Sequence, residues 1–263
     1  MTTQLVGIVN VTPDSFSDGG KAFSPAAALE HIAQLVREGA SVIDIGAEST
    51  RPNAAFVSPE EEWSRLEPIL KPVLEVYQKR GVVISVDTRH AATVAKALAL
   101  GVDWINDVSG GDPEMWALMR QYPQARYVLM HSLTVPAEPS MVLAPEADVI
   151  EELLVFFATK LVEMQLEEQQ VILDVGIGFG KTAEQSLEIM RRIGELTVLK
   201  LPLLVGHSRK SCFAEMANSP AIERDGATLA ASLYLAKNNV DYLRVHAVGL
   251  HQQAMKVAEY FDV

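Results

Sequence analysis

The sequence predicts an α/β fold, a single (β/α)8 TIM barrel of eight parallel strands that alternate with helices. Eight short apolar runs occur along the chain, and each is followed by a stretch of helical character. The runs are almost continuously apolar, as expected for parallel strands that are buried on both faces. The length of 263 residues is close to the roughly 250 residues typical of one barrel, so residues 1–263 are expected to form one domain.

The predicted strands are runs of β-branched, leucine or aromatic residues that stop at a polar residue or a glycine. They cover residues 5–9, 42–45, 82–86, 104–105, 127–130, 171–173, 203–205 and 242–245. Polar residues near their carboxyl ends include Asn10, Glu48, Asp87, Asn106, His131, Asp174, Ser208 and His246. In a TIM barrel the active site lies at the carboxyl ends of the strands. These residues are therefore expected to meet in one site.

The predicted helices fill the gaps between the runs. Ser24-Pro25 and Ser58-Pro59 each place a capping serine before a proline that suits the first helical turn. The helices are expected at residues 26–38, from 58 onward, and at 90–100, 112–121, 147–167, 182–195, 221–238 and 248–261. An open doubly wound sheet is the alternative architecture that the same alternation could build.

Two connections are longer than their strands and helices require. Residues 10–20 and 46–57 are rich in Gly, Pro, Ser and Asp, and they follow the first and second strands. Long loops at the catalytic end of a barrel commonly cover or bind the substrate. The loop at residues 132–145 contains three prolines, and we expect it to lie away from the site.

Composition limits the range of partners. The net charge of −12 argues against nucleic acid or an anionic membrane as a partner. No apolar run approaches the roughly 18 residues of a membrane span, and residues 1–9 carry no basic region, so we expect a cytoplasmic protein. The single cysteine, Cys212, cannot form an internal disulfide and is expected to be a buried core residue.

Residues 173–182 form a glycine-rich stretch that does not fit the common phosphate-binding motifs. A Walker A loop would need glycine at Val175, and the dinucleotide fingerprint would need glycine at Lys181. We expect the glycines instead to allow a flat ligand to approach, with Phe179 as a stacking face. A plain glycine-rich turn between strand and helix is the alternative.

Asp87, Asn106 and Asp174 suggest recognition of a heterocycle. Each aspartate alone could be a helix cap. Together with Asn106, they can accept and donate hydrogen bonds along a ring edge, and a carboxylate suits an amidine-like N–C–NH2 edge such as that of a pterin or guanine.

The basic residues gather where this fold often binds phosphate, after the seventh and eighth strands. Lys210 lies in residues 206–211, after the seventh strand. Arg244 and His246 end the eighth strand, and Arg51 adds a cation from the loop after the second strand. Solvated surface charge is the alternative.

His31, His90 and His251 are expected on helices as surface or packing residues, and His131 and His207 are weaker site candidates. No zinc motif is present, whereas Mg²⁺ held mainly by substrate phosphates would leave little trace in a sequence.

Nine segments in order resemble the dihydropteroate synthase family. They are GIVNVTPDSFSDGG (7–20), DIGAESTRP (44–52), ISVDT (84–88), INDVSG (105–110), VLMH (128–131), LDVGIGFGKT (173–182), SRKS (208–211), ATLA (227–230) and RVH (244–246). Together they span nearly the whole chain.

The resemblance implies condensation of 6-hydroxymethyl-7,8-dihydropterin diphosphate with 4-aminobenzoate, giving 7,8-dihydropteroate and diphosphate. By position, it implies pterin contacts from Asp87, Asn106, Met130, Asp174 and Lys210, and diphosphate and Mg²⁺ contacts from Asn10, Arg244 and His246. Thr50, Arg51, Pro52, Phe16, Phe179 and Ser208 would shape the aminobenzoate pocket. Asp87, Asp174, Lys210, Arg244 and His246 would be catalytic. A homodimer and competition by sulfonamides are also expected.

The chain departs from the family pattern at four places. Ala47 replaces a usual glycine, Val175 a usual proline, and Ala247 a common aspartate, and the loop after His131 lacks the usual Gly-x-Pro. None of these changes removes a residue with an assigned role. Two other hypotheses remain: a pterin-binding methyltransferase, which would not need Thr50 to Pro52, and a non-catalytic paralogue, which should have lost a loop or a cation.

Overall fold

The computed structural model describes residues 3–12, 24–49, 54–138 and 140–261, and it has the predicted closed barrel. The eight strands pair in parallel and in chain order, and β1 (Gln4–Asn10) closes the barrel against β8 (Tyr242–Val245). This closure excludes the open-sheet alternative. The other strands are β2 (Val42–Gly46), β3 (Val83–Asp87), β4 (Trp104–Asp107), β5 (Arg126–Met130), β6 (Val171–Asp174) and β7 (Leu203–Val205).

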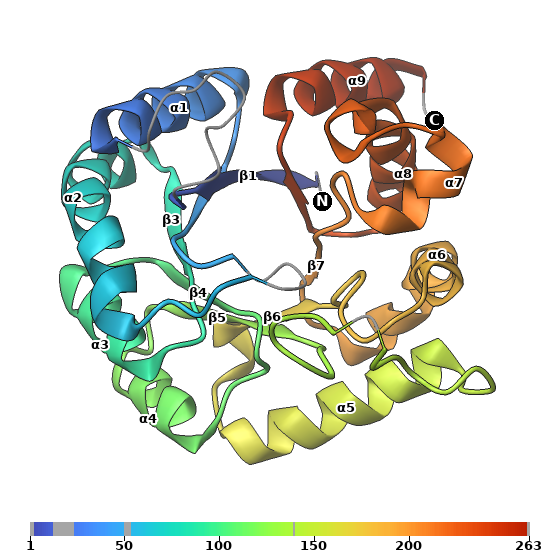
Figure 1. Ribbon diagram of the computed structural model, residues 1–263, viewed down its shortest axis with the longest axis horizontal. Helices are drawn as coiled ribbons and strands as arrows, with labels where there is room; N and C mark the ends of the chain where they lie inside the picture. The colour runs from blue at the N-terminus through green and yellow to red at the C-terminus, as the bar shows by residue number, and fades with distance from the viewer. Residues whose placement is uncertain (1–2, 13–23, 50–53, 139, 262–263) are drawn as a thin grey trace.

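Helices surround the barrel (Figure 1). They are α1 (Pro25–Glu38), α2 (Pro59–Tyr77), α3 (Ala91–Leu100), α4 (Pro113–Gln121), α5 (Val149–Met164), α6 (Ala183–Arg191), α7 (Ala214–Ala217), α8 (Asp225–Lys237) and α9 (Val248–Phe261). The expected serine caps are confirmed, because Ser24 Oγ accepts from Ala27 N and Ser58 Oγ accepts from Glu61 N, each at 3.2 Å.

Some helix boundaries were wrong. The helix expected to run to residue 195 stops at Arg191, and Ile193–Leu199 is a 3₁₀ helix instead. Gly194 lies at this change, and glycine is a poor α-helix former. The helix expected from residue 221 begins as a 3₁₀ turn, Ala221–Glu223, before α8. The single turn α7 was not predicted, because one turn is too short to show a helical period.

The bottom of the barrel interior is filled by an apolar layer. Val42, Trp104, Ile172 and Tyr242 come from the even-numbered strands, and Val6, Val128 and Leu204 join them from odd-numbered strands. The Trp104 and Tyr242 rings pack edge to face, with centroids 4.9 Å apart. Packed layers of this kind fill TIM barrels, so this end offers no passage.

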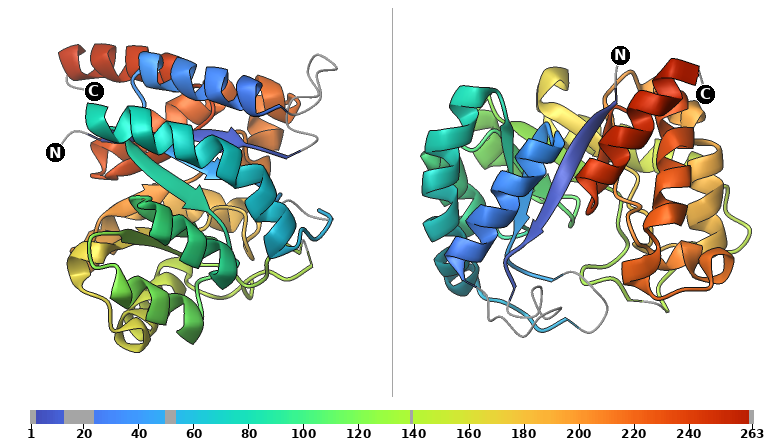
Figure 2. Two further views of the ribbon diagram at one scale, coloured as in Figure 1. Left: turned by 90° about the vertical axis from the view of Figure 1, so that its left-hand side faces the viewer. Right: turned by 90° about the horizontal axis from the view of Figure 1, so that it is seen from above.

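Side chains alternate along a strand, so the residue two positions after each member of this layer also points into the barrel. On the even strands those residues are Asp44, Asn106, Asp174 and Arg244. The interior therefore changes from apolar to polar within one layer, toward the carboxyl ends of the strands. The start of β1 and the end of α9 lie together at the opposite end of the barrel (Figure 2). Within the described ranges, no helix has the length and hydrophobicity needed to cross a membrane.

Candidate active site

Four buried or half-buried polar residues, which we call the polar layer, form the floor of the site: Asp44, Asn106, Asp174 and Arg244. Asp44 lies at its centre and is 1% exposed. Its Oδ2 accepts from Asn106 Nδ2 at 2.9 Å and from Arg244 Nε at 2.6 Å, and its Oδ1 accepts from Ser85 Oγ at 2.6 Å. Asp44 therefore orients both an amide and a guanidinium of the predicted site.

Sequence reasoning assigned no role to Asp44. It considered polar residues at strand ends, whereas Asp44 lies inside an apolar run. The sequence did contain a signal for Asp44. It follows Val42 by two positions, as Asn106 follows Trp104 and Arg244 follows Tyr242, and this shared spacing places all three polar residues on the same face of their strands.

Asp87 joins the polar layer from β3. Arg244 Nη2 donates to its Oδ2 at 2.7 Å, so one guanidinium binds two carboxylates. Burial raises the pKa of Asp87 to about 7, and the attraction of Arg244 opposes this shift only in part. Burial disfavours charge on Arg244, but Asp44 and Asp87 outweigh it and raise the pKa of the guanidinium.

A cavity lies above this floor, and it brings all five predicted pterin contacts together. Its lining includes Asp87, Asn106, Met130, Asp174, Phe179, Lys210 and Arg244. Lys210 Nζ lies 4.3 Å from the centroid of the Phe179 ring, so the cation faces an aromatic ring. Burial lowers the pKa of Lys210 to about 8, which leaves it mostly charged at neutral pH.

The cavity offers hydrogen-bond acceptors to a ligand. Asn106 must direct Nδ2 to the Asp44 carboxylate, and this contact fixes the orientation of the amide. Its buried Oδ1 then has no hydrogen-bond partner among the described residues. One oxygen of Asp174, Oδ1, accepts from Gly176 N at 2.8 Å, and burial raises the pKa of this carboxyl. A ligand that presents N–H donors would satisfy the unpaired acceptor.

Other predicted residues lie outside this cavity. Ser208 Oγ is 2.9 Å from His246 Nδ1, and His246 lines a second cleft between α1 and α9 with His31. Asn10 ends β1, with its Cα paired to that of Gly46 at the rim of the barrel. Four predicted aminobenzoate contacts lie outside the described residues: Phe16, Thr50, Arg51 and Pro52.

The loop after β5 is not remote from the site, contrary to expectation. Val135 and Ala137 pack against Val108, Met130 and Phe179. The same loop is hydrogen-bonded to the loop after β6, since Leu143 N donates to Gly180 O at 3.0 Å. The described part of this loop therefore covers apolar side chains of the cavity wall.

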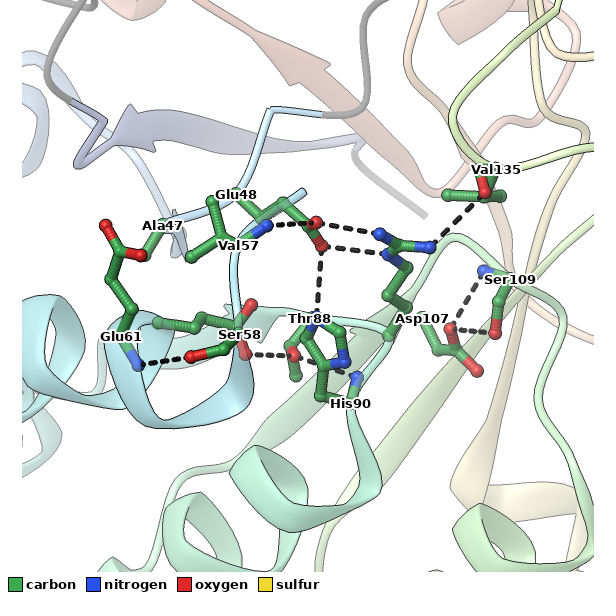
Figure 3. A network of polar contacts seen from close by, with 12 residues as sticks. Ala47, Glu48, Val57, Ser58, Glu61, Thr88, His90, Asp107, Ser109 and Val135 are labelled. Atoms are coloured by element: carbon green, nitrogen blue, oxygen red, sulfur yellow. Dashed lines mark hydrogen bonds and ion pairs between the residues drawn. The ribbon is translucent and has the colours of Figure 1, made fainter. Parts of the chain in front are cut away.

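An ion pair ties three loops together at the rim (Figure 3). Arg89 binds both oxygens of Glu48, each at 2.8 Å, and its Nη1 donates to Val135 O at 3.3 Å. Glu48 Oε1 also accepts from Val57 N at 3.2 Å. The loops after β2, β3 and β5 thus share one guanidinium, a contact that sequence reasoning missed.

His207, His251 and the cysteine are packing residues. His207 and His251 are fully buried, and both contact Ser232 Oγ, at 2.8 and 3.0 Å. Cys212 is buried, and burial raises the pKa of its thiol to about 11, so the reactive thiolate is disfavoured.

Two places bear on a metal. Glu48, Glu62 and His90 each bring a ligand atom within 4.8 Å of the others, but Arg89 already binds both oxygens of Glu48. An adjacent guanidinium opposes a second cation, so this group fits a metal poorly. Asn10 offers one neutral oxygen at the rim, which suits a Mg²⁺ ion whose other ligands are substrate phosphates and water.

A closed parallel barrel whose strand ends gather carboxylates, a lysine and an arginine around one cavity is the arrangement typical of TIM-barrel enzymes. The chain belongs to the family of pterin-binding enzymes, described as "Pterin binding enzyme", which matches residues 6–246.

Relatives in sequence confirm the resemblance to dihydropteroate synthase. The dihydropteroate synthase of Neisseria meningitidis is 40% identical over 99% of this chain and 93% of its own length. That of Synechocystis is 39% identical over 98% of this chain and 89% of its own length. The folate synthesis bifunctional protein of Chlamydia muridarum is 38% identical over 98% of this chain, but the chain spans only 59% of that relative.

Solved structures of dihydropteroate synthases are also similar to this chain. Dihydropteroate synthase from Anaplasma phagocytophilum, with bound 6-hydroxymethylpterin-monophosphate, has a TM-score of 0.89 at 36% identity and covers 99% of this chain and 100% of its own. The Xanthomonas albilineans enzyme with 4-aminobenzoic acid has a TM-score of 0.89 at 31% identity, covering 100% and 94%. The Yersinia pestis enzyme in complex with a sulfonamide drug has a TM-score of 0.90 at 33% identity, covering 99% and 94%.

Proposed function

We propose that this protein is a dihydropteroate synthase of folate biosynthesis. It joins the amine of 4-aminobenzoate to the methylene carbon of 6-hydroxymethyl-7,8-dihydropterin diphosphate and releases diphosphate. The observation that carries the proposal is the cavity floor, where Asp44 holds Asn106 with its Oδ1 free to accept, beside the carboxylates of Asp87 and Asp174. This arrangement suits the amidine-like edge of a pterin.

The chemistry follows from the charges. As the bond between the methylene carbon and the diphosphate oxygen breaks, positive charge develops on the carbon and spreads into the pterin ring. Asp87 and Asp174 stabilise that charge through the ring nitrogens, and Arg244 and Lys210 face the negative charge that leaves. The neutral aromatic amine then supplies its electron pair to the methylene carbon and becomes a positively charged, acidic nitrogen that releases one proton to water. No strong general base is needed, because the amine is already nucleophilic when neutral.

Magnesium is part of the proposal. Asn10 would contribute an oxygen ligand, and diphosphate would contribute most of the others. The ion would neutralise the charge of the leaving diphosphate. Arg244 and His246 would bind the same diphosphate, with His246 oriented by Ser208.

We also propose a cytoplasmic homodimer. The free thiol of Cys212 suits a reducing compartment. Large apolar side chains are exposed on the carboxyl-terminal helices, among them Met216, Tyr234 and Val257, and they offer a surface for a second copy. Sedimentation of the purified protein would give the oligomeric state.

Diphosphate release tests the function. Purified protein is given the pterin diphosphate and Mg²⁺, with or without 4-aminobenzoate. Release that depends on aminobenzoate, with 7,8-dihydropteroate detected, is the expected result. Binding of the pterin without release would favour a methyltransferase or a non-catalytic paralogue. A sulfonamide should compete with aminobenzoate, with an inhibition constant comparable to the KM for aminobenzoate, and a far weaker inhibition would count against the pocket assignment.

A further inference from the structure

The loop after β6 is built around a buried lysine. Lys181 is 6% exposed, and its Nζ lies 2.7 Å from His131 Nδ1, 2.9 Å from Phe179 O and 3.0 Å from Gly176 O. A fourth acceptor, His131 O, is 3.3 Å away. An ammonium group carries three protons, so the three nearest acceptors can each receive one.

This geometry also defines the state of His131. A protonated lysine has no lone pair, so His131 Nδ1 must accept and the imidazole must be neutral, with its proton on Nε2. Burial and the nearby Lys181 lower the pKa of His131 to about 3, which agrees with a neutral ring. Burial lowers the pKa of Lys181 to about 7, and the attraction of Asp174 opposes this shift.

The carbonyls held by Lys181 belong to residues of the cavity wall. Gly176, Ile177 and Phe179 line the cavity, whereas Lys181 does not. Gly176 is held on both sides, because its amide donates to Asp174 Oδ1 at 2.8 Å and its carbonyl accepts from Lys181. Gly176 has φ +64°, and a Cβ there would lie 1.9 Å from His131 O, so the loop passes very close to the end of β5.

The turn after Asp174 contains Val175, the position where the resemblance described above implies a proline, so no proline ring restricts the backbone here. Hydrogen bonds from Asp174 and Lys181 restrain the backbone of this turn in the absence of a proline. Asp174 fixes the turn at its first residue, and the Lys181 ammonium fixes it at Gly176 and Phe179.

We propose that Lys181 is a positioning residue for the reaction. It holds the carbonyls of Gly176 and Phe179 and thereby sets the shape of the cavity wall beside Asp174, against which the pterin ring binds. The inference rests on the proposed function and adds to it a residue outside the cavity that determines pterin affinity.

Calorimetric titration with the dihydropterin diphosphate, without aminobenzoate, tests the inference. Lys181→Met keeps the length of the side chain but removes all three donors. We expect it to bind the pterin at least about tenfold more weakly than the wild type. Lys256→Met, on the exposed face of α9, is the matched control and should bind normally.

A double variant separates positioning from stability. In Lys181→Met the buried His131 Nδ1 loses its hydrogen-bond donor. The double variant Lys181→Met/His131→Leu removes this unsatisfied acceptor, so its melting temperature should recover in part. Pterin affinity should stay low, because the carbonyls of Gly176 and Phe179 still lack their donor. If Lys181→Met does not fold, the pterin affinity of the double variant is compared with that of the wild type instead.

The outcomes are distinguishable. Wild-type affinity in Lys181→Met, or affinity that recovers together with stability in the double variant, would overturn the positioning role alone. A wild-type protein that does not bind the pterin would overturn the proposed function as well.

Discussion

Asp44 Oδ2 lies 2.6 Å from Arg244 Nε, although 200 residues separate them in the chain. Their strands, β2 and β8, both pair with β1, so this contact spans β1 inside the barrel. The same oxygen accepts from Asn106. One buried carboxylate thus fixes two side chains that the ligand is expected to meet.

Asp44→Asn should therefore weaken pterin binding without removing a residue of the cavity lining. The neutral amide cannot offer Asn106 and Arg244 the same charged acceptor. We expect a loss of about 1.5–3 kcal/mol, the range for a hydrogen bond to a charged group. Calorimetry would measure it, with Asp148→Asn on the surface as the control, and equal affinities would refute the role of Asp44.

Lys210→Ala should lower kcat by about 10²–10³-fold, as expected when one electrostatic contact to developing charge is lost. The cation lies in the cavity against Phe179. Steady-state diphosphate release would measure the change, with Lys237→Ala in the last turn of α8 as the control. Turnover near that of the wild type would show that Lys210 is dispensable.

The pKa of about 7 at Asp87 predicts a pH dependence of catalysis. Only the ionised carboxylate stabilises positive charge on the pterin, so kcat/KM for the pterin substrate should rise with pH through about 7. Asp87→Asn should lower activity and remove this step from the profile. If the pH profile of Asp87→Asn kept a step near pH 7, the titration would belong to another group.

The same shift has the opposite effect on the stability of the unliganded protein. The folded pKa of about 7 exceeds the ordinary aspartate pKa of 3.8, so the folded state holds this proton more tightly than the unfolded chain. The stabilisation is complete below about pH 3.8 and is lost as pH rises through about 7. The difference in melting temperature between wild type and Asp87→Asn, followed across this range, should show that trend.

Arg89→Met should raise the KM for 4-aminobenzoate severalfold and leave pterin affinity nearly unchanged. Glu48 lies two residues before Thr50, the first of three predicted aminobenzoate contacts in this loop, and Arg89 ties Glu48 to the loop after β5. Arg89→Lys should rescue only in part, because lysine cannot bind both carboxylate oxygens in the same planar geometry. Arg191→Met on the surface of α6 is the control, and an unchanged KM in Arg89→Met would exclude the role.

Tyr127→Phe should destabilise the fold by about 1–3 kcal/mol, the cost of leaving a buried acceptor without its donor. The Tyr127 hydroxyl donates to Asp107 Oδ2 at 2.6 Å, and both residues are fully buried. Denaturant unfolding would measure the loss. Tyr260→Phe, on the exposed surface of α9, should have no effect, and an equal result for both variants would contradict the argument.

The sequence predicted all eight strands, because each is a buried run with a distinct end. It also predicted the cavity residues that follow those runs, such as Asp87 and Asp174. Asp44 was missed because its function depends on which side of the strand it faces, and a single run does not show that. Arg89 was missed because it contacts loops that are distant in sequence. Lys181 was missed because the path of its own loop and the approach of His131, which together supply its acceptors, depend on the packed structure.

The closure of β1 against β8 has a consequence for the order of assembly. The acceptor at the centre of the site is supplied early in the chain, and its guanidinium partner comes from the last strand. A nascent or partly unfolded chain that has not yet docked β8 has no Arg244 to complete the floor of the cavity. Pterin binding therefore reports that the final strand is in place, and the substrate should act as a ligand that selects fully closed barrels during synthesis and refolding.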